Sequence, residues 1–549
     1  RDSLESRSPG RRQPGQVLFG GRPDVAVGFR ERVEQERLRG LVIDGAQERI
    51  VLVGMAGCGK SQLASALAQE CEEAGWGLVA WINASSAESV RSDLVELAHQ
   101  LGIDTSDTPS EHRVIQRCLK YLKSSALGDR LVVFDNVERI ENVAGLIPRG
   151  DDLRVVATTR SGRGWKGQGW ENVAVGVFPR EESVAYLLGA VESQDAEAAG
   201  AVARRLGDLP LALAQAAATA SNERWTLKRY LKRLEKYSSQ QTIHPVPGDS
   251  YTRDVSSALR MAVDSALDRI GDGLREVARL QVGALAVLAE SGVPTRWLDP
   301  LADEEQADEN TSAEETNKDA GAGPGGEDAD AGDAAAEKAH LALMVLLDAS
   351  VVQKSADGSV TMLHRLQGQV LRENWNQGER AEAFDAATDL LDRVNIDSLP
   401  RSNAEGRRQE ARDLIDQLRA IAAQNYSRPL FEREQVVAAL PHAFFHARDL
   451  GLPNEALALR GAVSAVEEVQ GDDHPHALAS RNGLAGAYES AGRLGEAIPL
   501  LEEVFADSVR VLGADHPDAL ASRGNLAVAY ESAGRLGEAI TLFEEVLAD

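Results

Sequence analysis

The segment that most restricts what this 549-residue chain can fold into is 54–61, which reads GMAGCGKS. An apolar run over 50–53 precedes it, and a helical pattern over 62–73 follows it. This is the GxxxxGK[ST] spacing in the strand, loop and helix context that a phosphate-binding loop requires. Glycines let backbone N–H groups point inward at phosphate oxygens, and the helix N-terminus adds its positive end. The sequence therefore predicts a nucleotide-binding α/β domain.

Within and after this loop, the side chains suit the handling of a magnesium nucleotide. We expect Lys60 to neutralise the β- and γ-phosphates and Ser61 to offer its hydroxyl to Mg²⁺. The apolar run 131–134 ends in Asp135, whose carboxylate is expected to hold Mg²⁺ through water. Without the loop, Asp135 could equally cap the next turn. The loop residues expected to bind nucleotide are Gly54, Gly57, Cys58, Gly59, Lys60, Ser61 and Gln62.

Two more features bear on catalysis. Asn136 stands where a second carboxylate could accept a proton from attacking water, so ATP hydrolysis is expected to be slow. Arg160 follows the apolar run 155–158 and could reach a γ-phosphate at the ligand edge of the sheet, although a solvated arginine after a strand is the alternative. The continuous apolar runs, 78–82 among them, predict strands buried on both faces of a parallel sheet.

Downstream of the α/β region the patterns turn helical and then end in a hairpin. The segments 349–353 and 359–363 flank a turn, and helices followed by a small hairpin suit a winged-helix domain. His364 ends the second strand, where a lone histidine is usually structural. Residues 303–338 carry 13 acidic and 2 basic side chains with almost no large apolar ones, so we expect a disordered insertion. A regulatory acidic tether is the alternative.

The C-terminal part contains an internal repeat. Residues 474–507 realign on 516–549, 42 positions later, with 27 of 34 identities. Leu484 and Tyr488 lie on one face of a first helix, Gly492 lies at a turn, and Ala497 sits where two helices would cross closely. The pattern predicts an α-solenoid of helix-turn-helix units, with a weaker copy over 438–471 as a divergent cap. The last copy stops inside its second helix, so we expect the array to run on.

Composition narrows the possible partners and compartment. The net charge of −27 argues against wrapping of nucleic acid, and no segment approaches the ~20 apolar residues of a membrane span. The cysteines, Cys58, Cys71 and Cys118, match neither a metal nor a disulfide framework, which favours a cytoplasmic protein.

Taken in order, the segments GMAGCGKS, LVVFDN, RVVATTR, GDLPLA and LHRL resemble the NB-ARC class of STAND signalling ATPases, which includes plant resistance proteins and apoptosome ATPases. The resemblance covers roughly residues 17–370. The repeats resemble the 42-residue tetratricopeptide units of kinesin-light-chain type, which are common in bacterial STAND proteins. The expected fold is thus a multidomain α/β plus α chain: a P-loop NTPase sheet, a helical domain, a winged helix and a tetratricopeptide solenoid.

The resemblance implies further roles. Lys60 with Ser61 matches the Walker A pair, Asp135 the Walker B acid and Arg160 the strand-end sensor. Pro210 matches the proline that packs on adenine, and His364 matches the MHD histidine that contacts the ADP β-phosphate and locks a closed state.

Arg22 belongs to the segment FGGR, which resembles a stretch whose backbone lies near adenine. The sequence departs from the family pattern at Asn136, at Arg365, which replaces the MHD aspartate, and at Asp208, which adds a residue before Pro210.

From these features we expect an ATP/ADP-dependent switch with slow ATPase activity. It would be closed with ADP and would open to self-associate with ATP and Mg²⁺ when the repeats bind a protein or peptide, in bacterial defence or regulation. The alternatives are a tetratricopeptide scaffold with a structural, non-cycling nucleotide site, and a transcriptional regulator whose output domain lies upstream. No membrane contact and no direct nucleic acid contact by this fragment are expected. The expected parts are a linker (1–16), a P-loop domain (17–178), a helical domain (179–250), a winged-helix domain (251–370), a helical linker (371–435) and the repeats (436–549).

Overall fold

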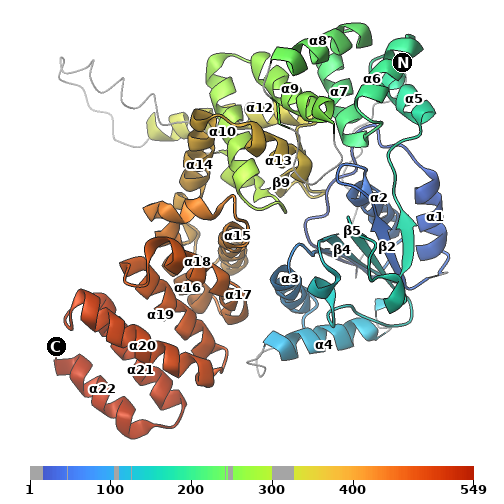
Figure 1. Ribbon diagram of the computed structural model, residues 1–549. Helices are drawn as coiled ribbons and strands as arrows, with labels where there is room; N and C mark the ends of the chain where they lie inside the picture. Colours follow the sequence, from blue (N-terminus) through green and yellow to red (C-terminus); the bar gives the residue numbers. More distant parts are fainter. Residues whose placement is uncertain are drawn as a thin grey trace, which may run out of the picture. The chain divides into compact units, whose positions relative to one another are not determined.

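The computed structural model describes most of the chain (Figure 1). The chain forms two compact units. The described residues are 16–45, 47–103, 111–124, 127–240, 243–244, 252–299 and 327–548. The expected linker 1–16, apart from its last residue, and the acidic residues 303–326 lie outside them. The first unit comprises Arg1–Trp81, Leu127–Ile140 and Arg154–Leu390, and the second comprises Ile82–Ala126, Glu141–Leu153 and Leu391–Asp549.

A six-stranded sheet confirms the predicted parallel α/β fold. Its order is β1-β3-β4-β5-β2-β6, and β1 with β3, β2 with β5 and β2 with β6 all pair in parallel. The four apolar runs expected as strands lie in β2 to β5, while the short strands β1 and β6 were not expected. The strands are β1 (Val17–Phe19), β2 (Arg49–Val53), β3 (Leu78–Asn83), β4 (Arg130–Val137), β5 (Leu153–Thr159) and β6 (Glu171–Ala174).

One core holds helices α1 (Val33–Val42) and α2 (Lys60–Glu73) against this sheet. Leu63 and Leu67 of α2 are fully buried together with Ile50 and Val133 of the strands. Burying a side chain of this size contributes about 1.5–3 kcal/mol, so the helix that follows the glycine loop is held firmly on the sheet.

A second core joins a helical region to the winged helix. It gathers small and aliphatic side chains of α5 (Arg180–Ala190), α6 (Ala196–Arg205), α7 (Pro210–Asn222), α8 (Leu227–Gln240) and α9 (Arg253–Asp268). Leu366 and Val370 of the winged helix are buried in it as well. Helix α9, expected as the first helix of the winged-helix domain, buries its apolar face in this core. The sequence could not predict this, because an amphipathic pattern does not say which core will bury the apolar face.

The winged-helix region has the expected hairpin. Strands β8 (Val352–Lys354) and β9 (Val360–Leu363) pair antiparallel, and β7 (Val293–Pro294) pairs with the other side of β9. Its helices are α10 (Asp272–Val287), α12 (Glu327–Asp348) and α13 (Arg365–Asn374). Residues 327–338, expected to be disordered, form the start of α12, where alanine favours helix and acidic residues suit the N-terminal end.

The second unit is helical. It includes α3 (Ala87–Gln100) and α4 (Glu111–Lys123) from the first half of the chain, and α14 (Gln377–Asp392) ends at its boundary. It continues with α15 (Ala404–Ala423), α16 (Glu434–Asp449), α17 (Pro453–Leu457), α18 (Arg460–Gln470), α19 (Pro475–Ser490), α20 (Leu494–Leu512), α21 (Pro517–Ser532) and α22 (Leu536–Ala548).

The predicted repeat is confirmed as two helix pairs, α19–α20 and α21–α22. His474 and His516 cap the first helix of each pair, with the ring nitrogen accepting a backbone N–H two residues later. These recurring histidines therefore start helices. Close helix crossing depends on Gly483, because a Cβ there would lie 2.7 Å from the Phe444 ring.

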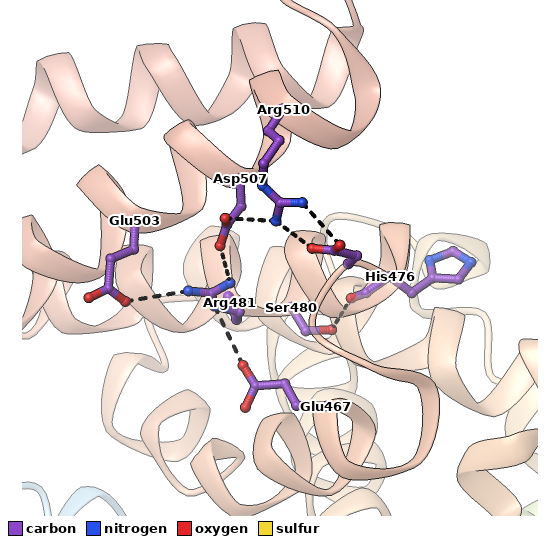
Figure 2. Close-up of polar contacts among 8 residues, drawn as sticks. Glu467, His476, Ser480, Arg481, Glu503, Asp507 and Arg510 are labelled. Carbon is purple, nitrogen blue, oxygen red and sulfur yellow. Dashed lines mark hydrogen bonds and ion pairs between the residues drawn. The ribbon is translucent and has the colours of Figure 1, made fainter.

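A buried arginine of the first repeat, Arg481, forms ion pairs with the neighbouring helices (Figure 2). Arg481 of α19 is 9% exposed and pairs with Glu467 of α18 at 3.4 Å and with Glu503 of α20 at 3.4 Å. It also pairs with Asp507 of α20 at 2.9 Å, and Arg510 shares that carboxylate at 2.9 Å. Hydrogen bonds from both guanidinium groups lower the pKa of Asp507. Arg481 thus joins three helices.

Candidate nucleotide-binding site

The glycines of the loop are required by its backbone and surroundings. Gly57 and Gly59 have φ of +74° and +98°, which other L-residues adopt at a cost. A Cβ on Gly54 would lie 2.2 Å from the carbonyl oxygen of Val175. The path of the loop from β2 to α2 therefore depends on these three residues.

Arg32, which no sequence motif predicted as a site residue, contacts the backbone of the glycine loop. Its guanidinium donates to the carbonyl oxygen of Cys58 at 3.0 Å and to that of Gly176 at 3.2 Å. It also lies 4.2 Å above the Phe178 ring. Burial lowers its pKa, yet an arginine remains charged. No local motif identifies Arg32, because its partners come from distant parts of the sequence.

The structure brings the three central predicted residues together. Ser61 Oγ donates to Asp135 Oδ1 at 2.8 Å, and Thr158 Oγ1 donates to the same oxygen at 2.5 Å. Lys60 Nζ donates to the carbonyl oxygen of Met55 at 2.8 Å. Burial raises the pKa of Asp135 and lowers that of Lys60, so each group favours a counter-charge in the site.

These residues fit a magnesium ion. Mg²⁺ prefers oxygen ligands and is commonly held by one or two protein groups besides water and phosphate. The Ser61 hydroxyl and the Asp135 carboxylate, in direct contact, supply such a pair. Within the described ranges, no three or more His, Cys, Asp or Glu side chains gather as a self-sufficient metal cage.

Asn136 adopts a left-handed backbone conformation with φ of +63°. Asparagine tolerates this region better than most residues. Its N–H donates to Thr158 Oγ1 at 2.8 Å, and its side-chain oxygen accepts from Arg365 at 3.4 Å. The amide is thus turned toward the winged helix.

Two further predicted site residues, Pro210 and Arg160, lie beside the glycine loop. Pro210 starts α7 beside the loop, since the N–H of the next residue, Leu211, donates to the carbonyl oxygen of Gly57 at 3.2 Å. Arg160 is exposed at the end of β5, close enough for its charge to act on Lys60. Both therefore border the glycine loop.

Gln62 and Arg22 are engaged within the protein. Gln62 accepts from the N–H of Ala26 at 2.7 Å. Arg22 donates to both carboxylate oxygens of Glu72 at 3.0 Å and to Ser65 Oγ at 2.9 Å. The backbone N–H and carbonyl of Arg22 are also bonded, the carbonyl to the N–H of Ala356 at 2.8 Å. Arg22 thus joins the first strand segment to α2 and to the winged-helix hairpin.

His364 caps α13 and lies near the site. Its Nδ1 accepts the N–H of Leu366 at 3.1 Å, which leaves Nε2 to carry the proton of the neutral ring. Burial, together with the charges of Lys60 and Arg365, lowers its pKa to about 4. Near neutral pH the imidazole is therefore an uncharged donor.

Arg365 bridges two parts of the first unit. Its guanidinium lies 2.7 Å from Glu138 Oε1, just past β4, and 3.4 Å from Glu290 Oε1, just past α10. Together with its contact to Asn136, the Arg365 guanidinium therefore contacts both the C-terminal end of β4 and the winged-helix region.

Comparison with known families agrees with this geometry. The NB-ARC domain model matches residues 32–187, and a tetratricopeptide-repeat model matches residues 481–548. The chain contains an NB-ARC domain and C-terminal tetratricopeptide repeats. The NB-ARC match contains the glycine loop, Asp135 and Arg160, so the P-loop NTPase assignment rests on the same residues as the geometry.

Many solved structures resemble parts of this chain, and three of them illustrate the likeness. A STAND protein with a tetratricopeptide repeat sensor from Pyrococcus horikoshii is 15% identical, with 96% of this chain and 78% of that chain covered and a TM-score of 0.39. A putative kinesin light chain with nearly identical TPR-like repeats from Podosopora anserina is 27% identical over 32% of this chain and 90% of that one, with a TM-score of 0.20. A Walker-type ATPase of Pyrococcus abyssi is 14% identical over 62% and 95%, with a TM-score of 0.27.

None of the three reaches a TM-score of 0.5, so the domain assignment rests on the family models. The comparison with curated proteins gave no match. In the part of the chain that the structure describes, no helix combines the length and apolarity needed to cross a bilayer. The three cysteines are free and buried.

Proposed function

We propose that this protein is a nucleotide-dependent switch that is closed with ADP and opens with ATP. The observation that carries the proposal is the gathering of Lys60, on the P-loop side, with His364 and Arg365, on the winged-helix side, in one compact unit. A nucleotide held by the loop would meet both sides. The conformation of the unit would then depend on which phosphates are present.

Different residues of the site would bind the phosphates, the magnesium ion and the base. The N–H groups of the glycine loop and the Lys60 ammonium bind phosphate oxygens, and the neutral His364 ring offers its Nε2–H to the same region. Ser61 and Asp135 would hold Mg²⁺, which when bound neutralises phosphate charge. Pro210 would pack on the base, and Arg160 would reach the γ-phosphate.

We propose that hydrolysis is slow and serves to reset the switch. Asn136 is an amide turned toward Arg365, and it cannot take a proton from water as a carboxylate does. Opening with ATP would expose surfaces for self-association, and the repeats would bind the protein or peptide ligand that biases opening. A place in bacterial defence or regulation is part of the same proposal.

The test is the identity of the nucleotide that copurifies with the protein. Chromatography of the supernatant after denaturation is expected to show adenine nucleotide, mostly ADP, at near one per chain. Guanine nucleotide, or folded protein that neither retains nor takes up ADP, would rule the switch out. ADP that is never exchanged for ATP, even in the presence of ligand for the repeats, would favour the structural-site scaffold instead.

A further inference from the structure

We propose that Arg365 and Glu138 form an electrostatic latch that holds the winged helix on the nucleotide-site strand independently of any phosphate. The proposal rests on the switch function proposed above and adds to it a regulatory contact. The latch is the ion pair between Arg365, the first residue of α13, and Glu138, which lies three residues beyond Asp135.

The geometry of the guanidinium supports this role. Arg365 Nη1 lies 2.7 Å from Glu138 Oε1 and 3.4 Å from Asn136 Oδ1, both on the segment that ends β4. Its Nε lies 3.4 Å from Glu290 Oε1, on the winged-helix side. A planar guanidinium can serve several acceptors in fixed directions, which a lysine ammonium cannot do as well. One side chain therefore connects two regions that lie 227 positions apart in sequence, from 138 to 365.

The surrounding charges favour a cation at this position. Two carboxylates, Glu138 and Glu290, face it, and the Arg365 side chain is 27% exposed while that of Glu290 is 17% exposed. An aspartate at position 365 would place a third carboxylate among them, and like charges at this distance repel. The arginine thus fits the acidic partners that this chain presents at the latch.

The latch also acts on the position of the adjoining site residues. Asn136 belongs to β4, the strand that carries Asp135, Glu138 follows the last residue of β4, and α13 begins directly after His364. While Arg365 holds the winged helix on this strand, His364 stays near Lys60. Release of bound ADP requires these two regions to separate, so the latch slows release.

The experiment is a double-mutant cycle on ADP release. Glu138→Gln, Arg365→Gln and the double variant are compared with wild type by displacement of a fluorescent ADP analogue in a stopped-flow instrument. A partly exposed ion pair contributes modestly, so each single variant is expected to release the analogue about three- to tenfold faster. The double variant is expected to be no faster than the faster single variant, because both changes remove the same contact.

Two controls separate the latch from a general loss of stability. Glu141→Gln removes an exposed carboxylate three residues beyond Glu138 and is expected to leave release unchanged. Raising NaCl from about 0.05 to about 0.5 M should speed release from wild type more than from Glu138→Gln, because salt screens the pair that the variant lacks. Wild-type release in Glu138→Gln, or additive effects in the double variant, would overturn the latch.

A second measurement does not depend on nucleotide. Spin labels on Arg163→Cys and Glu373→Cys report the distance between the P-loop side and α13 in nucleotide-free protein, while the three native cysteines are buried. The distance distribution is expected to broaden in Arg365→Gln. If ADP does not bind wild type at all, the switch function fails, and an unchanged distribution in Arg365→Gln shows separately that the latch fails.

Discussion

The hydroxyl of Ser61 donates a 2.8 Å hydrogen bond to Oδ1 of Asp135, across 74 positions of sequence. Ser61 is the second residue of α2, and Asp135 lies in β4, two residues before that strand ends, so the sheet and its helix hold them together. Both oxygens can then face one cation beside the phosphates. This contact turns two separate motifs into a single site.

Replacing Lys60 or Ser61 by alanine should weaken nucleotide binding about ten- to 150-fold while the repeats stay folded. Each charge-assisted hydrogen bond lost from a phosphate costs about 1.5–3 kcal/mol, whereas the repeats have a core of their own. Isothermal titration with ADP and the helical melting curve check both parts, with the exposed Lys166→Ala as control. Wild-type affinity in both variants would mean that the phosphate site is elsewhere.

The turnover of ATP should be far below the ~10 s⁻¹ typical of enzymes. Asn136→Asp alone should change it little, because the new carboxylate would pair with Arg365. In the double variant with Arg365→Gln the carboxylate is free to act as a base, and general base catalysis is worth about 10²–10⁴-fold at best. Phosphate release assays on wild type, both single variants and the double variant test this. A fast wild-type enzyme would contradict it.

The stability of the first unit should fall as the pH drops from about 6.5 toward 4. His364 has its pKa lowered to about 4 by burial and by the charges of Lys60 and Arg365. The unfolded state therefore binds more protons than the folded state between that value and the ordinary pKa of ~6.5, so stability rises with pH in this window.

His364→Asn should weaken this pH dependence, because asparagine caps the helix without titrating. Melting temperatures of nucleotide-free protein across the window measure the slope for both proteins. An identical slope in the variant would show that the pKa of His364 is the same in the folded and the unfolded protein, which would contradict the prediction.

Arg481→Ala should destabilise the repeats by about 1–3 kcal/mol, because it leaves carboxylates of α18 and α20 without their shared cation. The matched control is Arg493→Ala, whose arginine is 38% exposed and pairs with Glu496 on the same helix turn. Exposed pairs of this kind contribute about 0–1 kcal/mol. Denaturant titrations that give equal losses for the two variants would refute the tie between the three helices.

Gly54→Ala should disrupt the P-loop domain, because the new Cβ would lie 2.2 Å from a carbonyl oxygen that belongs to fixed backbone. Gly486→Ala is the control, since nothing lies within 4 Å of its Cβ position and alanine favours a helix. The first variant should lose ADP binding and the second should match wild type or gain stability. Normal ADP binding by Gly54→Ala would show that the loop can shift at this point.

Local pattern was enough to predict the parallel sheet, the glycine loop, the hairpin and the repeats. Continuous apolar runs, glycines at fixed spacing and a 42-residue period each follow from physics that acts within a short stretch of chain. Lys60, Ser61 and Asp135 were found for the same reason, because each directly follows a strand or loop signal. Their roles toward nucleotide remain predictions.

Only the tertiary structure decided which distant side chains meet. Arg32 supports the loop through Cys58 and Gly176, and Arg365 reaches Glu138 across the unit. An isolated arginine carries no sequence period that names its partner, since the pairing depends on how the helices and strands pack. The sequence thus determined the elements and their chemistry, and the packing determined the contacts between them.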